Sequence, residues 1–526
     1  MPREDTRAHE RADVIVVGSG IAGCAAALAA AREGADVLVL TKASRPDEAS
    51  TDWAQGGIST TRGDSEALER DIFEASDWTA DEDAVEVLVS DADHAVHDVL
   101  VDTLEIEFDR DGDDFDYARE AAHSERRILH VDASTGTHIL RPFLDHVDDH
   151  DRIEVRDDTA VLRLIAHEGT VHGVVSDEDS EGRPIYAGAT ILATGGIGSL
   201  YTRSTNPPGS TGDGIAMAAL AGADVADMEY VQFHPTAYTG SEGPGASENG
   251  SGEAASDDPF LLSEALRGEG AILLNGDGDR FMPEYHEDGE LAPRDVVARA
   301  VARERERTGE VLLDVSTLEE PFADAFPDLA AECAERGVAG DRIPVAPCEH
   351  FLCGGIDVDD RGRTSLDGLY AVGECARTGV HGANRLASTS LLEGLVWGLR
   401  AGEGAALDVD GEAGPTLVEA PELLNSDPDL PPRFAAEKFT RLRRTMDEYL
   451  GLERDPDGIA RAGAILRRLK GEVDAYVRTR TARDLYELRN ASVTALLIAR
   501  AARENEASVG CHYVVEEAEV GPPTGD

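Results

Sequence analysis

Residues 379–394, GVHGANRLASTSLLEG, place an imidazole, a guanidinium and two hydroxyls near the start of an expected helix over residues 386–399; the side chains are His381, Arg385, Ser388 and Ser390. A helix start usually needs only one capping oxygen, and its free N–H groups already attract anions. A cation and further donors at this terminus therefore predict an anion-binding site. The identity of the anion has to come from the rest of the chain.

A glycine-rich turn near the start of the chain points to a nucleotide. GSGIAG at 18–23 follows the apolar run DVIVV at 13–17 and opens an alanine-rich stretch at 21–33. Glycines in that setting allow a tight turn and close approach of the backbone to a pyrophosphate, which the helix N-terminus faces. The alternative is a plain glycine-rich turn. We expect dinucleotide contacts from Ser19, Gly20, Ile21 and Ala22.

The residues after the second expected strand depart from the usual dinucleotide pattern. That strand, DVLVL at 36–40, is followed by Thr41 and Lys42. A nicotinamide-dinucleotide site usually has an acidic residue here, which binds a ribose hydroxyl. Lys42 instead suits a phosphate or another kind of ribose contact, so the sequence argues against a standard nicotinamide site.

A second cluster of small and amide residues, STDWAQGG, lies at 50–57. Such residues let backbone N–H donors approach a flat polar ring, although a surface loop with glycines is the alternative. We expect cofactor contacts from Ser50, Thr51, Ala54, Gln55, Gly56 and Gly57.

The order of expected elements indicates an α/β fold with an insertion. Strand and helix patterns alternate at the start, as in a doubly wound sheet. Two later strands, TILATGG at 190–196 and GLYAVGE at 368–374, also end in glycine. If both join the first sheet, the chain leaves that domain near residue 230 and returns near 351. Three helical patterns at 434–450, 458–477 and 485–506 predict a terminal helical unit, and the Gly/Ser/acidic segment 241–259 predicts a mobile loop.

Composition narrows the class of protein. The 526 residues include 48 Lys+Arg and 105 Asp+Glu, a net charge of −57, and only three lysines. This surface repels nucleic acid and anionic membrane, and it is typical of proteins from salt-loaded cytoplasm. The polar N-terminus and the lack of a long apolar run favour a cytoplasmic location. The six cysteines are scattered, so we expect neither a disulfide framework nor a metal site.

Several long motifs in order identify a resemblance. They are STDWAQGG, TGDG (211–214), QFHPT (232–236), LLSEALRGEGA (261–271), RFMPEYHEDGELAPRDVVARA (280–300), CGGI (353–356), GLYAVGE and HGANRLASTSLLEG. From about residue 11 to 515 the chain resembles the flavoprotein family of succinate dehydrogenases, fumarate reductases and L-aspartate oxidases. The resemblance implies a Rossmann-like FAD domain (1–232 and 351–410), an inserted α+β capping domain (233–350) and a C-terminal three-helix domain (425–526).

The resemblance also implies roles for particular residues. A dicarboxylate must be held beside the flavin by fixed cations. Arg385 with His350 would bind one carboxylate, and His234 with Ser263 the other. Arg294 would contact a carboxylate and carry a proton; its ordinary alternative is a surface salt bridge, and that of Ser263 is a helix N-cap. The remaining expected contacts are Gln232 in the substrate site and Asp213, Glu374, Ser390 and Leu391 with FAD.

Two positions favour the oxidase branch of the family. The respiratory enzymes usually carry a flavin-linked histidine where this chain has Ser50, so we expect noncovalent FAD. REAAHS at 119–124 resembles the oxidase segment in which a glutamate, here Glu120, faces the substrate ammonium group. Pairing with that ammonium would discriminate aspartate from succinate. The alternative is that Glu120 is one more surface acid.

The expected reaction is therefore oxidation of L-aspartate to iminoaspartate, at the start of NAD biosynthesis, with O2 (giving H2O2) or fumarate as acceptor. Quinolinate synthase is the family's partner. The alternatives are a soluble fumarate reductase or succinate dehydrogenase flavoprotein subunit, and a flavin-binding protein without turnover. One departure concerns the tail, where Val509 stands in place of the family's arginine, so its docking is an open question.

Overall fold

The computed structural model describes residues 10–132, 134–238, 240, 259–338, 340–409, 414–427, 430–431 and 433–515. Its main sheet has seven strands, in the order β8-β2-β1-β11-β10-β9 with β20 beside β11. Parallel pairing joins β8, β2, β1, β11 and β20, whereas β10 runs antiparallel to β9 and β11. The bounds are β1 Glu10–Val17, β2 Val37–Leu40, β8 Ile153–Arg156, β9 Val161–His167, β10 Thr170–Ser176, β11 Arg183–Leu192 and β20 Leu369–Ala371.

The pairing of β20 with β11 confirms that the chain returns to its first sheet. Thr190 lies opposite Leu369 in this parallel pair, although the two are 179 positions apart in the sequence. Both strands are apolar and buried, as expected for parallel strands covered on both faces. The glycines that follow these two strands therefore lie at the same end of the sheet, the end where its parallel strands finish.

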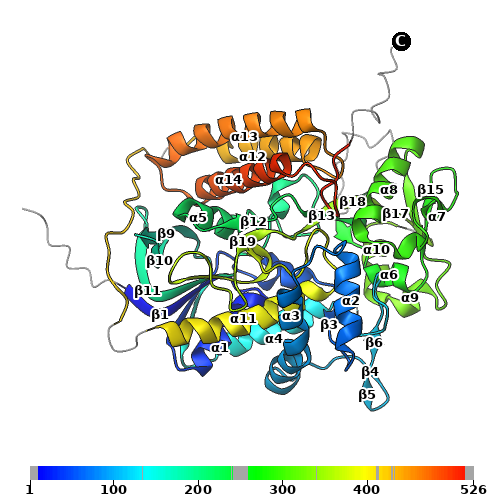
Figure 1. Cartoon of the computed structure of the whole chain (residues 1–526), viewed down its shortest axis with the longest axis horizontal. Coiled ribbons are helices and arrows are strands. Elements are labelled where there is room, and N and C mark those ends of the chain that lie inside the picture. The colour runs from blue at the N-terminus through cyan, green and yellow to red at the C-terminus, as the bar shows by residue number, and fades with distance from the viewer. Residues whose placement is uncertain are drawn as a thin grey trace, which may run out of the picture.

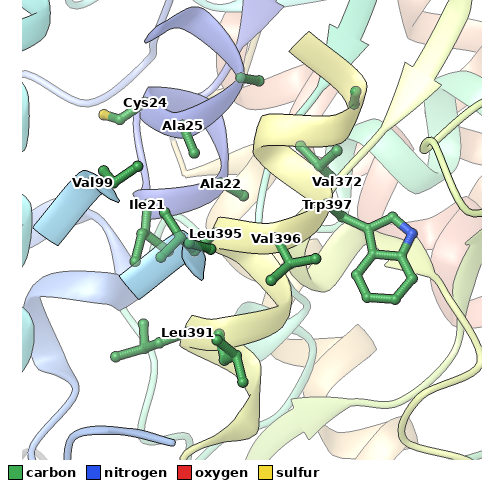
Figure 2. Packing of buried hydrophobic residues seen from close by; sticks show 14 of the residues in the cluster. Ile21, Ala22, Cys24, Ala25, Val99, Val372, Leu391, Leu395, Val396 and Trp397 are labelled. Carbon is green, nitrogen blue, oxygen red and sulfur yellow. The ribbon is translucent and has the colours of Figure 1, made fainter. Parts of the chain in front are cut away.

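Helices α1 (Ile21–Arg32) and α11 (Thr389–Asp408) pack closely on one face of this sheet (Figures 1 and 2). The contact uses small residues: an added Cβ on Gly398 or Gly402 would collide with backbone carbonyls of α1. Gly394 lies against Ile21 and Ala22, and Gly402 lies against residues 26–29, so the two helices run in the same direction. Their N-termini consequently open at the same end of the sheet.

The start of α11 corrects one sequence-based expectation. The helix begins at Thr389 rather than at residue 386, because Ser388 adopts a left-handed conformation with φ +56°. Leu386 is buried ahead of the helix, and its carbonyl accepts a hydrogen bond from the Thr389 hydroxyl at 2.8 Å.

The inserted segment, whose ribbon is mainly green in Figure 1, has a hydrophobic core of its own. Strands β13 (Val231–Tyr238), β18 (Ala346–Leu352) and β14 (Phe260–Leu261) form one sheet, and β15 (Ile272–Asn275), β16 (Val311–Asp314) and β17 (Arg342–Pro344) form another. The helices are α6 Glu264–Gly268, α7 Met282–Tyr285, α8 Arg294–Thr308, α9 Phe322–Ala325 and α10 Pro327–Glu335. The predicted loop at 241–259 lies outside the described residues, apart from its last position.

The three expected C-terminal helices are present as α12 (Phe434–Tyr449), α13 (Pro456–Val477) and α14 (Arg483–Glu504). In Figure 1 they lie over α5 (Asp213–Ala221), which follows the TGDG motif. Asn490 donates to Asp213 at 2.9 Å and Thr494 donates to the Gly212 carbonyl at 3.1 Å. The C-terminal unit is thus joined directly to the turn that starts α5.

The remaining elements complete the first domain. They are α2 Ser65–Ala75, α3 Glu82–Ala95, α4 Thr135–Asp148 and the short strands β3 Ile58–Ser59, β4 Arg110–Asp111, β5 Asp114–Phe115, β6 Tyr117–Ala118, β7 Ile128–Leu129, β12 Val225–Ala226, β19 Gly355–Asp357 and β21 Ala376–Arg377. Among the helices of the described residues, none has the length and apolar character that spanning a bilayer requires.

Candidate active site

One cavity collects nearly all the residues singled out in the sequence. Its wall includes every expected cofactor contact, and also Glu120, His234, Ser263, Arg294, His350 and Arg385. Gln232 is the exception: its buried side chain lies behind the wall and holds the arginines in place. We divide the wall into a lysine region (Lys42, Asp213, Glu487 and Asn490) and an arginine region (Glu120, His234, Arg294, His350 and Arg385).

The first glycine turn is built to receive a pyrophosphate. Gly18 has φ +110°, and a Cβ there would collide with the Ala193 carbonyl; a Cβ on Gly23 would collide with the carbonyl of Gly18. Helix α1 then begins at Ile21 with no capping bond from its N-cap residue Gly20 and no acidic residue in its first turn. The Ile21 N–H donates to Thr51 Oγ1 at 3.2 Å, which leaves the N–H groups of Ala22 and Gly23 for a phosphate oxygen.

The N-terminus of α11 offers a second set of donors in the same cavity. Ser388 precedes the helix without capping it, and the first turn carries no acidic residue. The Ser388 carbonyl instead accepts from the backbone N–H of Ser59 at 3.0 Å and from its hydroxyl at 2.8 Å. Two uncapped, parallel helix termini fit a dinucleotide whose pyrophosphate and ring system both need hydrogen-bond donors, so the residues present are compatible with FAD.

The lysine region is neutralised from within the chain. Lys42 donates to Asp213 at 2.6 Å and to Glu487 at 3.0 Å, while Thr211 and Asn490 also donate to Asp213. Burial alone would lower the pKa of Lys42, but the two carboxylates raise it. Asp213 correspondingly has a lowered pKa, because the charge of Lys42 outweighs its burial. Sequence reasoning missed Glu487 and Asn490, which lie on α14 and belong to no motif.

In the arginine region, Arg294 begins α8 and lies 7% exposed. It donates to Glu264 through Nε and to the Gln232 side-chain oxygen through Nη1, the latter at 2.8 Å. Glu264 also pairs with the buried Arg267. Arg294 is therefore not a surface salt bridge. Glu264 was overlooked because a glutamate in a short helix is unremarkable among so many acids.

Arg385 lies under the start of α11. Its Nη1 donates to Ser390 at 2.6 Å, its Nη2 donates to His350 Nε2 at 2.8 Å, and its guanidinium lies 4.4 Å above the Phe351 ring. Gln232 braces it from behind, donating to the Arg385 carbonyl at 2.8 Å. These contacts fix the guanidinium plane toward the cavity wall.

The buried arginines repel one another. Burial and the charge of Arg294 lower the pKa of Arg385 to about 9, and burial lowers that of Arg294 to about 10. Burial, with the charge of Arg294, also lowers the pKa of Arg267 to about 9. Such a group of desolvated cations favours binding of an anion, and a dicarboxylate would supply two negative charges.

His234 supplies an unpartnered donor beside these cations. Its Nδ1 accepts from the Thr236 backbone N–H at 3.2 Å, so the proton of the neutral ring is on Nε2. Among the described residues this buried Nε2 has no hydrogen-bond partner, and Glu264 Oε2 lies 3.9 Å from it. Burial keeps its pKa well below the usual value. Ser263 lines the cavity and caps α6, accepting from Ala265 N at 3.3 Å, so the N-cap interpretation is correct.

Glu120 is not a surface acid: it is 3% exposed and accepts from Ser388 Oγ at 2.5 Å. Burial raises its pKa. Gly56 makes room for this carboxylate, since a Cβ at that position would collide with Glu120 Oε1. The motif STDWAQGG and the motif REAAHS thus meet at one point in the cavity wall.

The C-terminal tail docks on the rest of the protein although Val509 stands in place of the arginine. Cys511 N donates to the Ala383 carbonyl at 2.9 Å, and the buried Arg454 donates to His512 Nδ1 at 2.8 Å. Val509 forms a tight turn with His512, its N–H donating to the His512 carbonyl at 2.9 Å. The tail therefore braces the segment just before Arg385.

Comparisons with known proteins agree with this geometry. The FAD binding domain family matches residues 13–391. A quinol fumarate reductase chain of E. coli superposes with a TM-score of 0.84 at 28% identity, covering 97% of this chain and 92% of that one. Sdh1 of Mycobacterium smegmatis gives 0.77 at 28% identity, with 97% and 89% covered. The fold and cavity thus define an FAD-binding flavoprotein.

Sequence relatives narrow this class further. L-aspartate oxidase of Halobacterium salinarum is 64% identical over 523 residues, covering 98% of both chains. The enzyme of the same name from Streptomyces coelicolor is 38% identical over 532 residues, covering 97% of this chain and 89% of that one. The chain belongs to the L-aspartate oxidase family.

Proposed function

We propose that this protein oxidises L-aspartate to iminoaspartate with noncovalently bound FAD, passing electrons to O2 or to fumarate, as the first step of NAD biosynthesis. The observation that carries the proposal is the arginine region. It combines buried cations, which Glu264 offsets in part, and an imidazole donor with a second buried carboxylate, Glu120, beside the start of α11. Aspartate carries the complementary charges: two carboxylates and one ammonium group.

FAD, when bound, supplies the oxidising chemistry by taking a hydride from the substrate carbon. The chain would hold it by the N-termini of α1 and α11, with Ser50 and Gln55 among the residues facing it. Ser50 cannot form the histidine link of the respiratory enzymes, so acid precipitation should release the flavin into the supernatant. A yellow pellet would contradict the noncovalent assignment.

The substrate carboxylates would divide between two groups of residues. Arg385 and His350 would bind one, and His234 with Ser263 the other. Holding both carboxylates fixes the position of the carbon between them, which is the main requirement for hydride transfer. Arg294 would contact the same carboxylates and hold a proton at its guanidinium, with Glu264 behind it as an ion-pair partner.

Glu120 would select the amino acid. An ammonium beside its carboxylate would counteract the effect of burial, which raises the pKa of Glu120. Succinate lacks the ammonium and would leave the buried carboxylate of Glu120 with the Ser388 hydroxyl but with no cationic group of the ligand, which costs about 1–3 kcal/mol. A fumarate reductase or succinate dehydrogenase subunit, the second candidate, has no need of this group.

The deciding experiment is anaerobic mixing of the purified protein with L-aspartate in molar KCl, following loss of the oxidised flavin absorbance, with succinate in parallel. We expect bleaching by aspartate. Bleaching by succinate alone would move the protein to the respiratory branch and remove Glu120 from substrate selection.

The proposal also covers the cellular setting of the enzyme and its partner. The formal net charge of −57 and the relative from Halobacterium salinarum support a halophilic cytoplasmic enzyme. Iminoaspartate hydrolyses readily, so quinolinate synthase is the partner that would use it. Enzyme and partner should therefore be assayed together.

A further inference from the structure

The hydrogen bonds around His350 fix the position of its proton. Arginine can only donate, so His350 Nε2, which contacts Arg385 Nη2 at 2.8 Å, must be an acceptor. Burial and the charge of Arg385 keep the pKa of His350 well below the usual value, so the ring is neutral. Its single proton is therefore on Nδ1, which donates to Thr205 Oγ1 at 2.7 Å.

This arrangement conflicts with the role that the substrate requires. To bind a carboxylate together with Arg385, His350 has to donate from Nε2, because a carboxylate only accepts. A neutral ring can do this only if Nδ1 gives up its proton and becomes an acceptor. The partner of Nδ1 must then change from acceptor to donor, and a hydroxyl is a side-chain group that serves in both ways.

Thr205 is held so that its hydroxyl can serve in both ways. It is 6% exposed, and its Oγ1 also lies 3.3 Å from the Glu349 carbonyl, to which it donates while it accepts from His350. Two hydrogen bonds hold residues 205–206 against β18. Thr205 N donates to the Glu349 carbonyl at 3.0 Å, and Asn206 Nδ2 donates to the His350 carbonyl at 2.7 Å. Rotation of the hydroxyl from Glu349 to Nδ1 needs no movement of the chain.

We propose that Thr205 is a positioning residue that lets His350 change tautomer when a carboxylate binds. Before binding, Nδ1–H donates to Thr205 and Nε2 accepts from Arg385. After binding, the Thr205 hydroxyl donates to Nδ1 and Nε2–H donates to the carboxylate. As the ligand enters, Nδ1 gives one proton to water and Nε2 takes one proton from water. The charge of the ring is therefore zero before and after binding.

This inference rests on the proposed function, since it assumes that His350 contacts a substrate carboxylate. The kinetic test compares Thr205→Val, which keeps the shape and removes the hydroxyl, with Thr205→Ser, which restores it. Because the lost contact serves ground state and transition state alike, KM for L-aspartate should rise about tenfold in the Val variant with little change in kcat. The Ser variant should resemble the parent protein.

A matched control is Thr202→Val. Thr202 lies in the same segment, but its hydroxyl bonds Asp447 on α12, away from His350. The Thr202→Val variant should bind FAD like the other variants and keep the KM of the parent protein for L-aspartate. The role of Thr205 would be overturned if Thr205→Val had the KM of the parent protein. It would also be overturned if KM rose equally in Thr205→Val and Thr205→Ser.

A spectroscopic test reports the tautomer directly. Oxidised holoenzyme carrying ¹⁵N-histidine is studied by NMR with and without fumarate, which oxidised flavin cannot reduce, and the His350 signals are assigned by their absence in His350→Gln. We expect the proton to move from Nδ1 to Nε2 on fumarate addition in the parent and Ser proteins, and not in the Val variant. A ring with the same tautomer in both states would overturn the inference. Failure of the parent protein to oxidise aspartate would instead overturn the proposed function.

Discussion

The lysine and arginine regions of one cavity treat their cations in opposite ways. Lys42 has two carboxylate partners from the chain, Asp213 and Glu487, and its pKa is raised. Among the described residues the Arg385 guanidinium bonds only neutral groups, namely Ser390, His350 and Gln232, and its pKa falls to about 9 because burial and Arg294 disfavour its charge. The protein completes its charge balance in the first region and leaves it incomplete in the second.

This difference indicates in which of the two regions a charged ligand should bind. A cation already paired within the chain gains little from a further anion, so the lysine region suits the uncharged hydroxyls of a cofactor. A desolvated cation without a carboxylate gains a great deal from one. Glu264 offsets Arg294 and Arg267 only in part, so the two carboxylates of a bound substrate would complete the balance.

The largest effect that tests this comparison is expected at Arg294. Replacing it with Leu should lower turnover of aspartate by about 10²–10⁴-fold, because a carboxylate contact and a proton carrier are both lost, while FAD remains bound. Steady-state kinetics and flavin content measure the two effects.

The control for that variant is Arg303→Leu on the same helix, where the guanidinium pairs with Glu453 and is 41% exposed. It should keep the parent turnover. Near-normal activity of Arg294→Leu would reduce Arg294 to a structural ion pair in the capping segment.

A smaller effect is expected at Glu120. Glu120→Gln should weaken use of aspartate relative to reduction of fumarate by about 10–100-fold, because only aspartate has an ammonium for the carboxylate to bind. The ratio of the two kcat/KM values measures this. Glu125→Gln, at an exposed position in the same loop, should leave the ratio unchanged; equal loss of both activities in Glu120→Gln would contradict the selection role.

Binding of FAD should depend on pH through Glu374. Burial, reinforced by the charge of Glu349, raises the pKa of Glu374 to about 8, so the carboxyl is protonated at neutral pH in the FAD-free protein. A cofactor hydroxyl that donates to the carboxylate would lower this pKa, so FAD binding would release a proton. Affinity should then rise with pH, by up to about tenfold per unit, and level off above pH 8.

Titration calorimetry of the FAD-free protein between pH 6 and 9 measures this, in two buffers of different ionisation enthalpy. Glu374→Gln should remove the dependence while the parent protein shows it. An affinity that is flat across this range in the parent would separate Glu374 from the cofactor.

The smallest effect is expected in the lysine region. Lys42→Met leaves Asp213 and Glu487 without their cation and should lower the free energy of unfolding by about 1–2 kcal/mol, with kcat unchanged. Thermal melting measures it. Lys438→Met is the matched control, with a side-chain exposure of 25% against 27% for Lys42 and one carboxylate partner, Glu472, at the surface. A large loss of kcat in Lys42→Met would place the lysine in the chemistry.

Much of the fold was predictable because its signals are local. The apolar run before GSGIAG, the alanine-rich α1 and the three C-terminal patterns each indicate their element within about twenty residues. Two similar glycine-ended strands predicted that the chain returns to its first sheet, and the pairing of β20 with β11 confirms that return. The start of α11 was misplaced by three residues because the left-handed conformation of Ser388, a residue type that normally caps helices, has no signature in sequence.

By itself the sequence determined which residue types the cavity would contain, since the motifs are contiguous and their spacing is tied to strand and helix starts. Only the tertiary structure decided how those residues are paired. Glu487 reaches Lys42 across 445 positions and Thr205 reaches His350 across 145, and no periodicity encodes such contacts. Pairing decides whether a buried charge or proton is satisfied, and a buried group left unsatisfied is one that a ligand can complete.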